Sequence, residues 1–110
     1  MGLSTHPLGK VNNDLEVILN WESYDENILM SWISLTGTAK EAKKYEYTLK
    51  LLNKGGAEII TTKKTECLPC DMSSDDVKKK ATALFLTQDD VKRAETDEKK
   101  LKWKVLIKKK

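Results

Sequence analysis

The chain has 110 residues, of which 39% are hydrophobic and 34% charged, a balance typical of one globular domain rather than of a disordered or fibrous chain. No apolar run approaches the roughly 20 residues that a membrane-spanning helix needs. Twenty basic residues face seventeen acidic ones, and all the basic residues except Arg93 are lysines. Because phosphate recognition favours the arginine fork, this composition favours a solvated lysine surface over a nucleic-acid binder.

The compartment follows from the N-terminus and the cysteines. Residues 1–7 lack the basic and then apolar pattern of a secretory signal. Two cysteines cannot hold a secreted fold together, so a reducing environment suits them better. We therefore expect a protein of the cytoplasm or the nucleus, with no membrane partner.

Residues 15–36 contain two stretches that alternate with the period of a strand. In the first, Leu15, Val17, Leu19 and Trp21 share a face, with Asp14, Glu16 and Asn20 opposite. The second stretch, residues 27–36, is apolar on both faces, with Leu29, Ile33 and Leu35 on one and Ile28, Met30 and Trp32 on the other. We expect this second strand to lie centrally and to be covered on both sides.

Residues 37–42 then form a short connection that allows a single helical turn. The next predicted strand places Tyr45, Tyr47, Leu49 and Leu51 on one face. The turn Asn53-Lys54-Gly55-Gly56 separates it from the β-branched run at residues 59–62. Since glycine readily adopts positive φ, this spacing predicts a hairpin.

The pattern changes after residue 62. Ser73 or Ser74 can cap a helix with acidic residues in its first turn and lysines in its last. Residues 83–86 are a short apolar strand, and the Thr87-Gln88-Asp89-Asp90 sequence predicts a capping box opening a helix through Ala94. The closing strand alternates Leu101, Trp103, Val105 and Ile107 with Lys100, Lys102, Lys104 and Leu106. Runs of strands without regular helical crossovers predict a mainly β fold, an antiparallel sheet or sandwich with two short helices between the later strands.

Residues 35–51 resemble a signature of the seven-in-absentia (Sina) family and read LTGTAKEAKKYEYTLKL. In that family a strand ends in a Gly-Thr turn, and a polar stretch leads to an aromatic-x-Tyr-x-Leu strand. The hairpin, the two helices, the short strand and the closing strand follow in the family's order. The resemblance covers a domain at residues 13–108, which leaves residues 1–12 as a flexible or sheet-edge segment and 109–110 as a basic tail.

The resemblance implies a TRAF-like β-sandwich, the substrate- and adaptor-binding part of a RING-type E3 ubiquitin ligase. Such a module binds extended peptides along its sheet and commonly forms dimers, so we expect ubiquitin-pathway peptides or a second copy as partners. The chain departs from the family in three respects. The family strands that form much of the peptide groove lie before the matched region, where residues 1–13 stand here. Cys67, Cys70 and His6 are too few ligands for a RING, and Lys104 stands where the family has a peptide-contacting Asn. The chain is thus expected to be non-catalytic and without a cofactor, either as part of a longer ligase or as a stand-alone relative.

Other candidate chemistries have simpler structural explanations. Cys67-Leu68-Pro69-Cys70 could be a redox pair or half of a zinc site, although an ordinary reduced pair is favoured. The adjacent acidic pairs, Asp75-Asp76 and Asp89-Asp90, suit helix first turns rather than acid–base catalysis. No catalytic residue is expected, because the single histidine lies near the N-terminus and the chain has no glycine-rich phosphate loop.

We predict two partner-binding surfaces. One is the second face of residues 27–36, with Ile28, Met30 and Trp32, provided that no other layer covers it. The other is the outward face of the closing strand, with Lys102, Lys104 and Leu106. The alternative function is a lysine-rich β-domain that binds nucleic acid, with Trp103 among the lysines of the tail.

Overall fold

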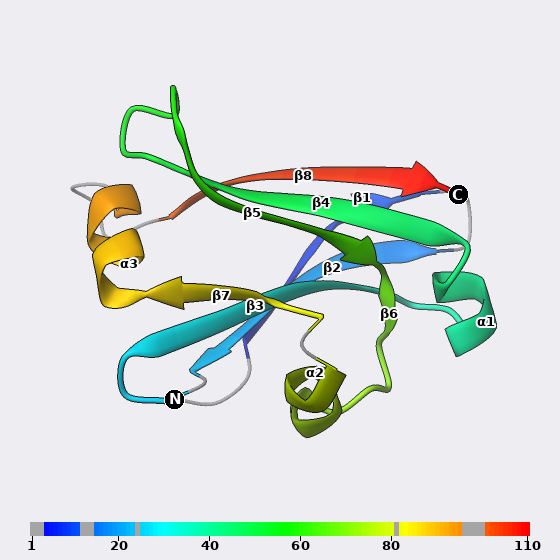
Figure 1. The fold of residues 1–110 in the computed structure, drawn as a ribbon. Helices are drawn as coiled ribbons and strands as arrows, with labels where there is room; N and C mark the ends of the chain where they lie inside the picture. The colour runs from blue at the N-terminus through cyan, green and yellow to red at the C-terminus, as the bar shows by residue number, and fades with distance from the viewer. Residues whose placement is uncertain (1–3, 12–14, 24, 81, 96–100) are drawn as a thin grey trace.

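The computed structural model describes residues 4–11, 15–23, 25–80, 82–95 and 101–110, and it folds them into two sheets (Figure 1). The larger sheet runs in the order β1 (Ser4–Lys10), β2 (Glu16–Ser23), β3 (Ile28–Leu35), and two short strands, β6 (Leu68–Pro69) and β7 (Leu84–Thr87), share the far edge of β3. The smaller sheet runs β5 (Ile59–Glu66), β4 (Tyr45–Leu52), β8 (Lys102–Lys109). All strand pairs are antiparallel except β3 with β6. The expectation of a mainly β, antiparallel fold in two layers is confirmed.

The main core lies between the two sheets. Tyr47, Leu49 and Leu51 of β4 are fully buried against Ile33 and Leu35 of β3 and the inward residues of β2. The predicted inward face of β8 packs on the same core with half-buried Trp103, Val105 and Ile107. Period-two alternation therefore identified the buried face of these strands. Asp14 and Lys100, predicted on outward faces, lie outside the described residues.

The two later helices begin at the predicted capping residues, and the short helix that precedes them in the sequence has a capping box that was not predicted. In α1 (Ala39–Ala42) and α3 (Gln88–Ala94), the Thr38 and Thr87 hydroxyls each accept a hydrogen bond from the backbone of the third helical residue, which completes a capping box. In α2 (Ser74–Lys80), the Asp76 backbone donates to Ser73 Oγ at 3.2 Å. The longest described helices, α2 and α3, have seven residues each, and no described helix is long and apolar enough to cross a membrane.

A second, smaller core covers the side of β3 that points away from the smaller sheet. Met30 and Trp32 are 0% and 3% exposed, and they pack with Leu68 of β6 and Val77 of α2. Figure 1 shows α2 lying over this side of the larger sheet, next to β6. The exposed patch proposed for this face is therefore absent at Met30 and Trp32, because α2 supplies the layer that the strand's two apolar faces require.

Two strands were not resolved by sequence periodicity. The segment at residues 4–10 has little apolar alternation, yet it forms the edge strand β1, with a register shift between Pro7 and Gly9. Gly9 has φ of 138°, a conformation suited to glycine at such an irregularity. Strand β6 is only two residues long and lies within the Cys67–Cys70 segment. Both strands owe their structure to pairing with a neighbour, β2 or β3.

Candidate functional site

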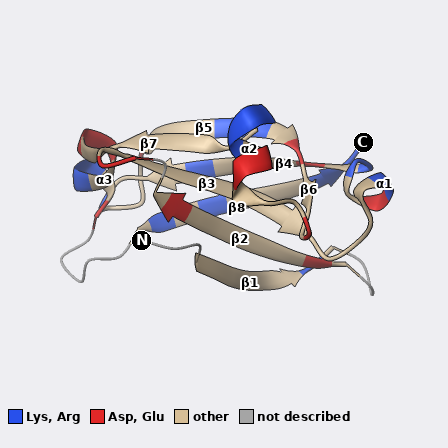
Figure 2. Cartoon of the chain, turned by 90° about the horizontal axis from the view of Figure 1, so that it is seen from below, with Lys and Arg blue, Asp and Glu red and all other residues tan. Residues whose placement is uncertain are grey.

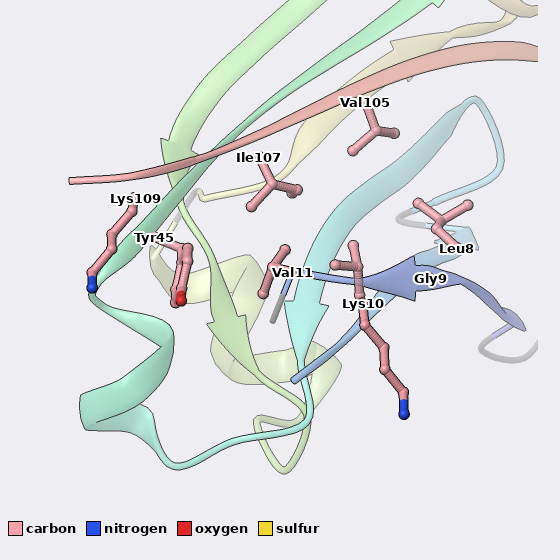
Figure 3. Close-up of a pocket in the computed structure, with 9 residues that line it drawn as sticks. Leu8, Gly9, Lys10, Val11, Tyr45, Val105, Ile107 and Lys109 are labelled. Carbon is pink, nitrogen blue, oxygen red and sulfur yellow. The ribbon is translucent and has the colours of Figure 1, made fainter. Parts of the chain in front are cut away.

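A groove of about 540 Å³ separates the edge strands β1 and β8 (Figure 3). Val105 and Ile107 of β8 line it from one side, with Tyr45 at the start of β4. Figure 3 shows Val105 and Ile107 pointing into the space that faces Val11 and Leu8. The remaining lining residues are Gly9, Lys10, Val17 and Lys109. The groove therefore combines apolar lining residues with one lysine from each side, Lys10 of β1 and Lys109 of β8.

The unequal width of the two sheets creates this groove. The larger sheet continues beyond β2 to β1, whereas the smaller sheet ends at β8. In Figure 2, β1 lies at the margin of the molecule, beyond β2 and β8. His6 and Gly9 are exposed although their register partners on β2, Leu19 and Val17, are buried. The inward side of β1 thus lacks an opposing strand in the described part of the chain.

Strands β1 and β8 also end the hydrogen-bonded ladders of their sheets. Strand β1 pairs with β2 alone and β8 with β4 alone among the described residues. An edge strand presents backbone donors and acceptors that can pair with another extended chain. The groove therefore lies between two backbone edges, and the edge of β8 is the straighter of the two because its register with β4 is uninterrupted.

The outward side of the smaller sheet is rich in lysine. We use "outer face" for Lys50 of β4, Lys64 of β5, and Lys102, Lys104 and Lys108 of β8. Lys104 lies directly opposite Lys50, whereas Lys108 lies opposite Glu46. Like charges in directly opposed positions of a sheet repel one another. Within the described residues, the ion pairs of this sheet are Lys64 with Glu46, at 3.7 Å, and Lys110 with Glu66.

The lysines of the outer face are therefore paired with carboxylates at one end of the sheet only, among the described residues. Both ion pairs lie toward the C-terminal end of β8, and the hydrogen bond from Lys110 lowers the pKa of the Glu66 carboxyl. At the other end, Lys50, Lys102 and Lys104 have no carboxylate partner among the described residues. The predicted contact residues Lys102, Lys104 and Leu106 are all exposed there, Leu106 by 47%. Ile28, at the start of β3, is half-buried.

The Cys67–Cys70 segment connects the two sheets. The Cys67 backbone donates to the Tyr45 carbonyl of the smaller sheet at 3.0 Å, and the Cys70 backbone donates to the Leu35 carbonyl of the larger sheet at 3.1 Å. Both thiols are free; Cys67 is buried and Cys70 exposed. Burial raises the pKa of the Cys67 thiol to about 12, which keeps it protonated at neutral pH and unreactive. This geometry favours a structural role for the segment.

Sequence reasoning missed the groove, because no local pattern reports which strands end a sheet. The inward residues Val105 and Ile107 were assigned to the core, and they are half-exposed because no described strand lies beyond β8 in the smaller sheet. Within the described ranges, no three His, Cys, Asp or Glu side chains lie close enough together to hold a metal ion. No known protein-family model and no curated protein matches the sequence.

Proposed function

We propose that the chain is a protein-interaction domain that binds an extended peptide as an added strand along β8, within the groove that faces β1. The observation that carries this proposal is that, in the described part of the chain, the smaller sheet has no strand beyond β8 to face β1. A peptide at that position would pair its backbone with the edge of β8 and bury alternate side chains on Val105 and Ile107. In this mode, main-chain hydrogen bonds supply affinity and the side-chain pockets supply selectivity.

The Sina-like signature at residues 35–51 supports the same role. It is carried by the end of β3, α1 and β4, the segment that connects the two sheets. We extend the proposal to a TRAF-like sandwich that recognises ubiquitin-pathway partners, with ubiquitin transfer performed elsewhere than on this chain. The groove between β1 and β8 would then serve in place of the family groove, from which the sequence departs at Lys104.

The test is selection of peptides from a random displayed library against the immobilised chain, followed by amide hydrogen exchange with the enriched peptides. We expect backbone amides of β8 to gain protection on binding, because an added strand would bond to them. Enrichment of no peptide, or protection confined to a different surface, would overturn the proposal.

A pair of variants gives an independent check. Val105→Asp places a carboxylate on the groove floor and should abolish binding of the enriched peptides. Ile60→Asp changes a residue of similar burial at the opposite edge of the same sheet, and it should leave their affinity unchanged. If Val105→Asp does not fold, the exchange footprint on the unaltered chain decides the question.

Nucleic acid is a second candidate ligand for the outer face, since Lys50, Lys102 and Lys104 have no carboxylate partner among the described residues. Binding through phosphates weakens steeply with salt. A single-stranded oligonucleotide that bound tightly, lost affinity in proportion to added salt and did not compete with the peptides would favour this alternative. Competition from a second copy, seen as self-association in sedimentation, would instead indicate that the missing strand comes from a dimer.

A further inference from the structure

The side chains of β8 alternate between the groove and the outer face. A strand paired with β8 would alternate in the same way, so β8 determines which kind of side chain suits each of its positions. Side chains of neighbouring strands that lie directly opposite each other point to the same side of the sheet. Residues of the added strand would therefore alternate between the groove, beside Val105 and Ile107, and the outer face, beside Lys102 and Lys104. Each side sets a different chemical requirement.

On the groove side the requirement is apolar. Val105, Ile107 and Val17 line the part of the groove beside β8, and a polar side chain buried against these three would lose water without gaining a hydrogen-bond partner from them. Residues of the added strand that face the groove should thus be aliphatic. They would also reduce the exposure of Val105 and Ile107, which remain half-exposed without an opposing layer.

On the outer face the requirement is negative charge. Lys102 and Lys104 are exposed and have no carboxylate partner among the described residues, and Lys104 is opposed by Lys50 on its other side. Neighbouring outward positions of one strand lie about 6.6–6.8 Å apart, so two acidic residues at positions i and i+2 would match the lysine spacing. An opposed acidic residue lies close enough to a lysine to stabilise the pair.

We infer that the partner segment has the pattern acidic–apolar–acidic–apolar, with its two acidic side chains beside Lys102 and Lys104. This inference rests on the proposed function, because it takes the added strand on β8 as given. The pattern argues against a second copy paired through its own β8, since that would bring two lysine rows together. The composition of the outer face argues against nucleic acid, because its described residues include no aromatic side chain on which a base could stack.

Three synthetic peptides of about nine residues test the pattern. The first alternates valine and glutamate, the second alternates valine and threonine, and the third has the composition of the first with its glutamates in one block. Threonine is a better strand former than glutamate, so a loss of affinity in the second peptide cannot come from strand propensity. We expect the first peptide to bind roughly tenfold more tightly than the second, and this advantage to shrink as salt is added.

A double variant supplies the matching change on the protein. Lys102→Glu with Lys104→Glu should lower affinity for the valine–glutamate peptide by roughly tenfold or more while leaving the valine–threonine peptide unaffected. Lys40→Glu with Lys79→Glu, on the exposed surfaces of α1 and α2, makes the same change in net charge and should change neither affinity.

The outcomes separate the inference from the proposed function. Equal affinity of the first two peptides, with β8 amides protected by both, overturns the acidic pattern and leaves the peptide-binding function intact. Equal affinity of the first and third peptides also overturns it, because attraction would then not depend on register. If no peptide protects β8 amides, the proposed function fails and the inference fails with it.

Discussion

Two buried titratable side chains, Tyr47 and Cys67, illustrate how the core tolerates polar atoms. Tyr47 is fully buried, and its hydroxyl donates to the Thr82 carbonyl at 2.8 Å. Desolvation raises its pKa well above the ordinary value, so the neutral donor form persists. Cys67 lies in the same core cluster. The core therefore accommodates both side chains as long as they stay protonated.

The thiol of Cys67 predicts a pH dependence of stability. Its pKa is about 12 in the folded chain, against an ordinary value of 9.0, so the unfolded chain releases the proton first. The stabilisation is fully present below about pH 9 and declines as the pH rises toward 12. Between about pH 8 and pH 10, the free energy of unfolding should fall by about 1 kcal/mol more in the parent chain than in Cys67→Ala.

Urea unfolding of both proteins at the two pH values measures this difference. The alanine variant is expected to be less stable throughout, because it loses buried sulfur, but its stability curve should be flatter in this range. Parallel curves for the two proteins would show that the Cys67 thiol is not protected by burial.

At the scale of elements, capping residues close in the sequence determine where α2 and α3 begin. Contacts with distant residues determine which surface α2 covers. The capping residues Thr87 and Asp90 predicted where α3 begins, and of the two candidate caps for α2, Ser73 and Ser74, the structure uses Ser73. That α2 covers Met30 and Trp32 could not be read from its own residues, since only Val77 of the helix is buried. One apolar residue in a seven-residue helix is too weak a pattern to identify a packing partner.

The cover that α2 provides can be tested with Val77→Asp. A carboxylate at this buried position would have no described cation beside it in the small core, so the variant should lose roughly 2–3 kcal/mol of stability. We expect α2 to separate from β3, which would expose Met30 and Trp32. Lys79→Asp, on the exposed side of the same helix, should have little effect.

Amide hydrogen exchange and binding of a hydrophobic dye report on this separation. Faster exchange at α2 together with increased dye binding is the expected result for Val77→Asp. Unchanged dye binding would mean that α2 is not the layer that keeps this apolar face from water.

At the scale of the whole molecule, the two sheets differ in width and the charges are unevenly compensated. One end of the outer face is neutralised by Glu46 and Glu66, whereas Lys50 and Lys104 face each other at the other end. This opposition costs stability in the unbound chain. Figure 2 shows lysine segments along β8 and β5 and few acidic segments beside them.

Lys104→Glu should therefore stabilise the unbound chain, by about 0.5–1 kcal/mol at low salt, by replacing a repulsive pair with an attractive one. Lys102→Glu makes the same change in net charge, but it lies opposite Leu52 and should bring no such gain. Thermal or urea unfolding at low and high salt measures both, and the gain for Lys104→Glu should shrink at high salt. Equal effects of the two substitutions would show that net charge, rather than the Lys50–Lys104 pair, governs stability.

The sequence by itself determined most of the strands, where α2 and α3 begin and which side chains of the predicted strands face inward. Those properties depend on neighbours within a few positions, such as the alternation of Leu49 and Leu51 or the Thr87 cap. Only the tertiary structure decided which apolar faces are covered. Two apolar pairs look alike in the sequence, Met30 with Trp32 and Val105 with Ile107. Helix α2 buries the first pair, whereas no described strand covers the second. Whether a face is covered depends on how far each sheet extends and what crosses it, and contacts between residues distant in the chain set both.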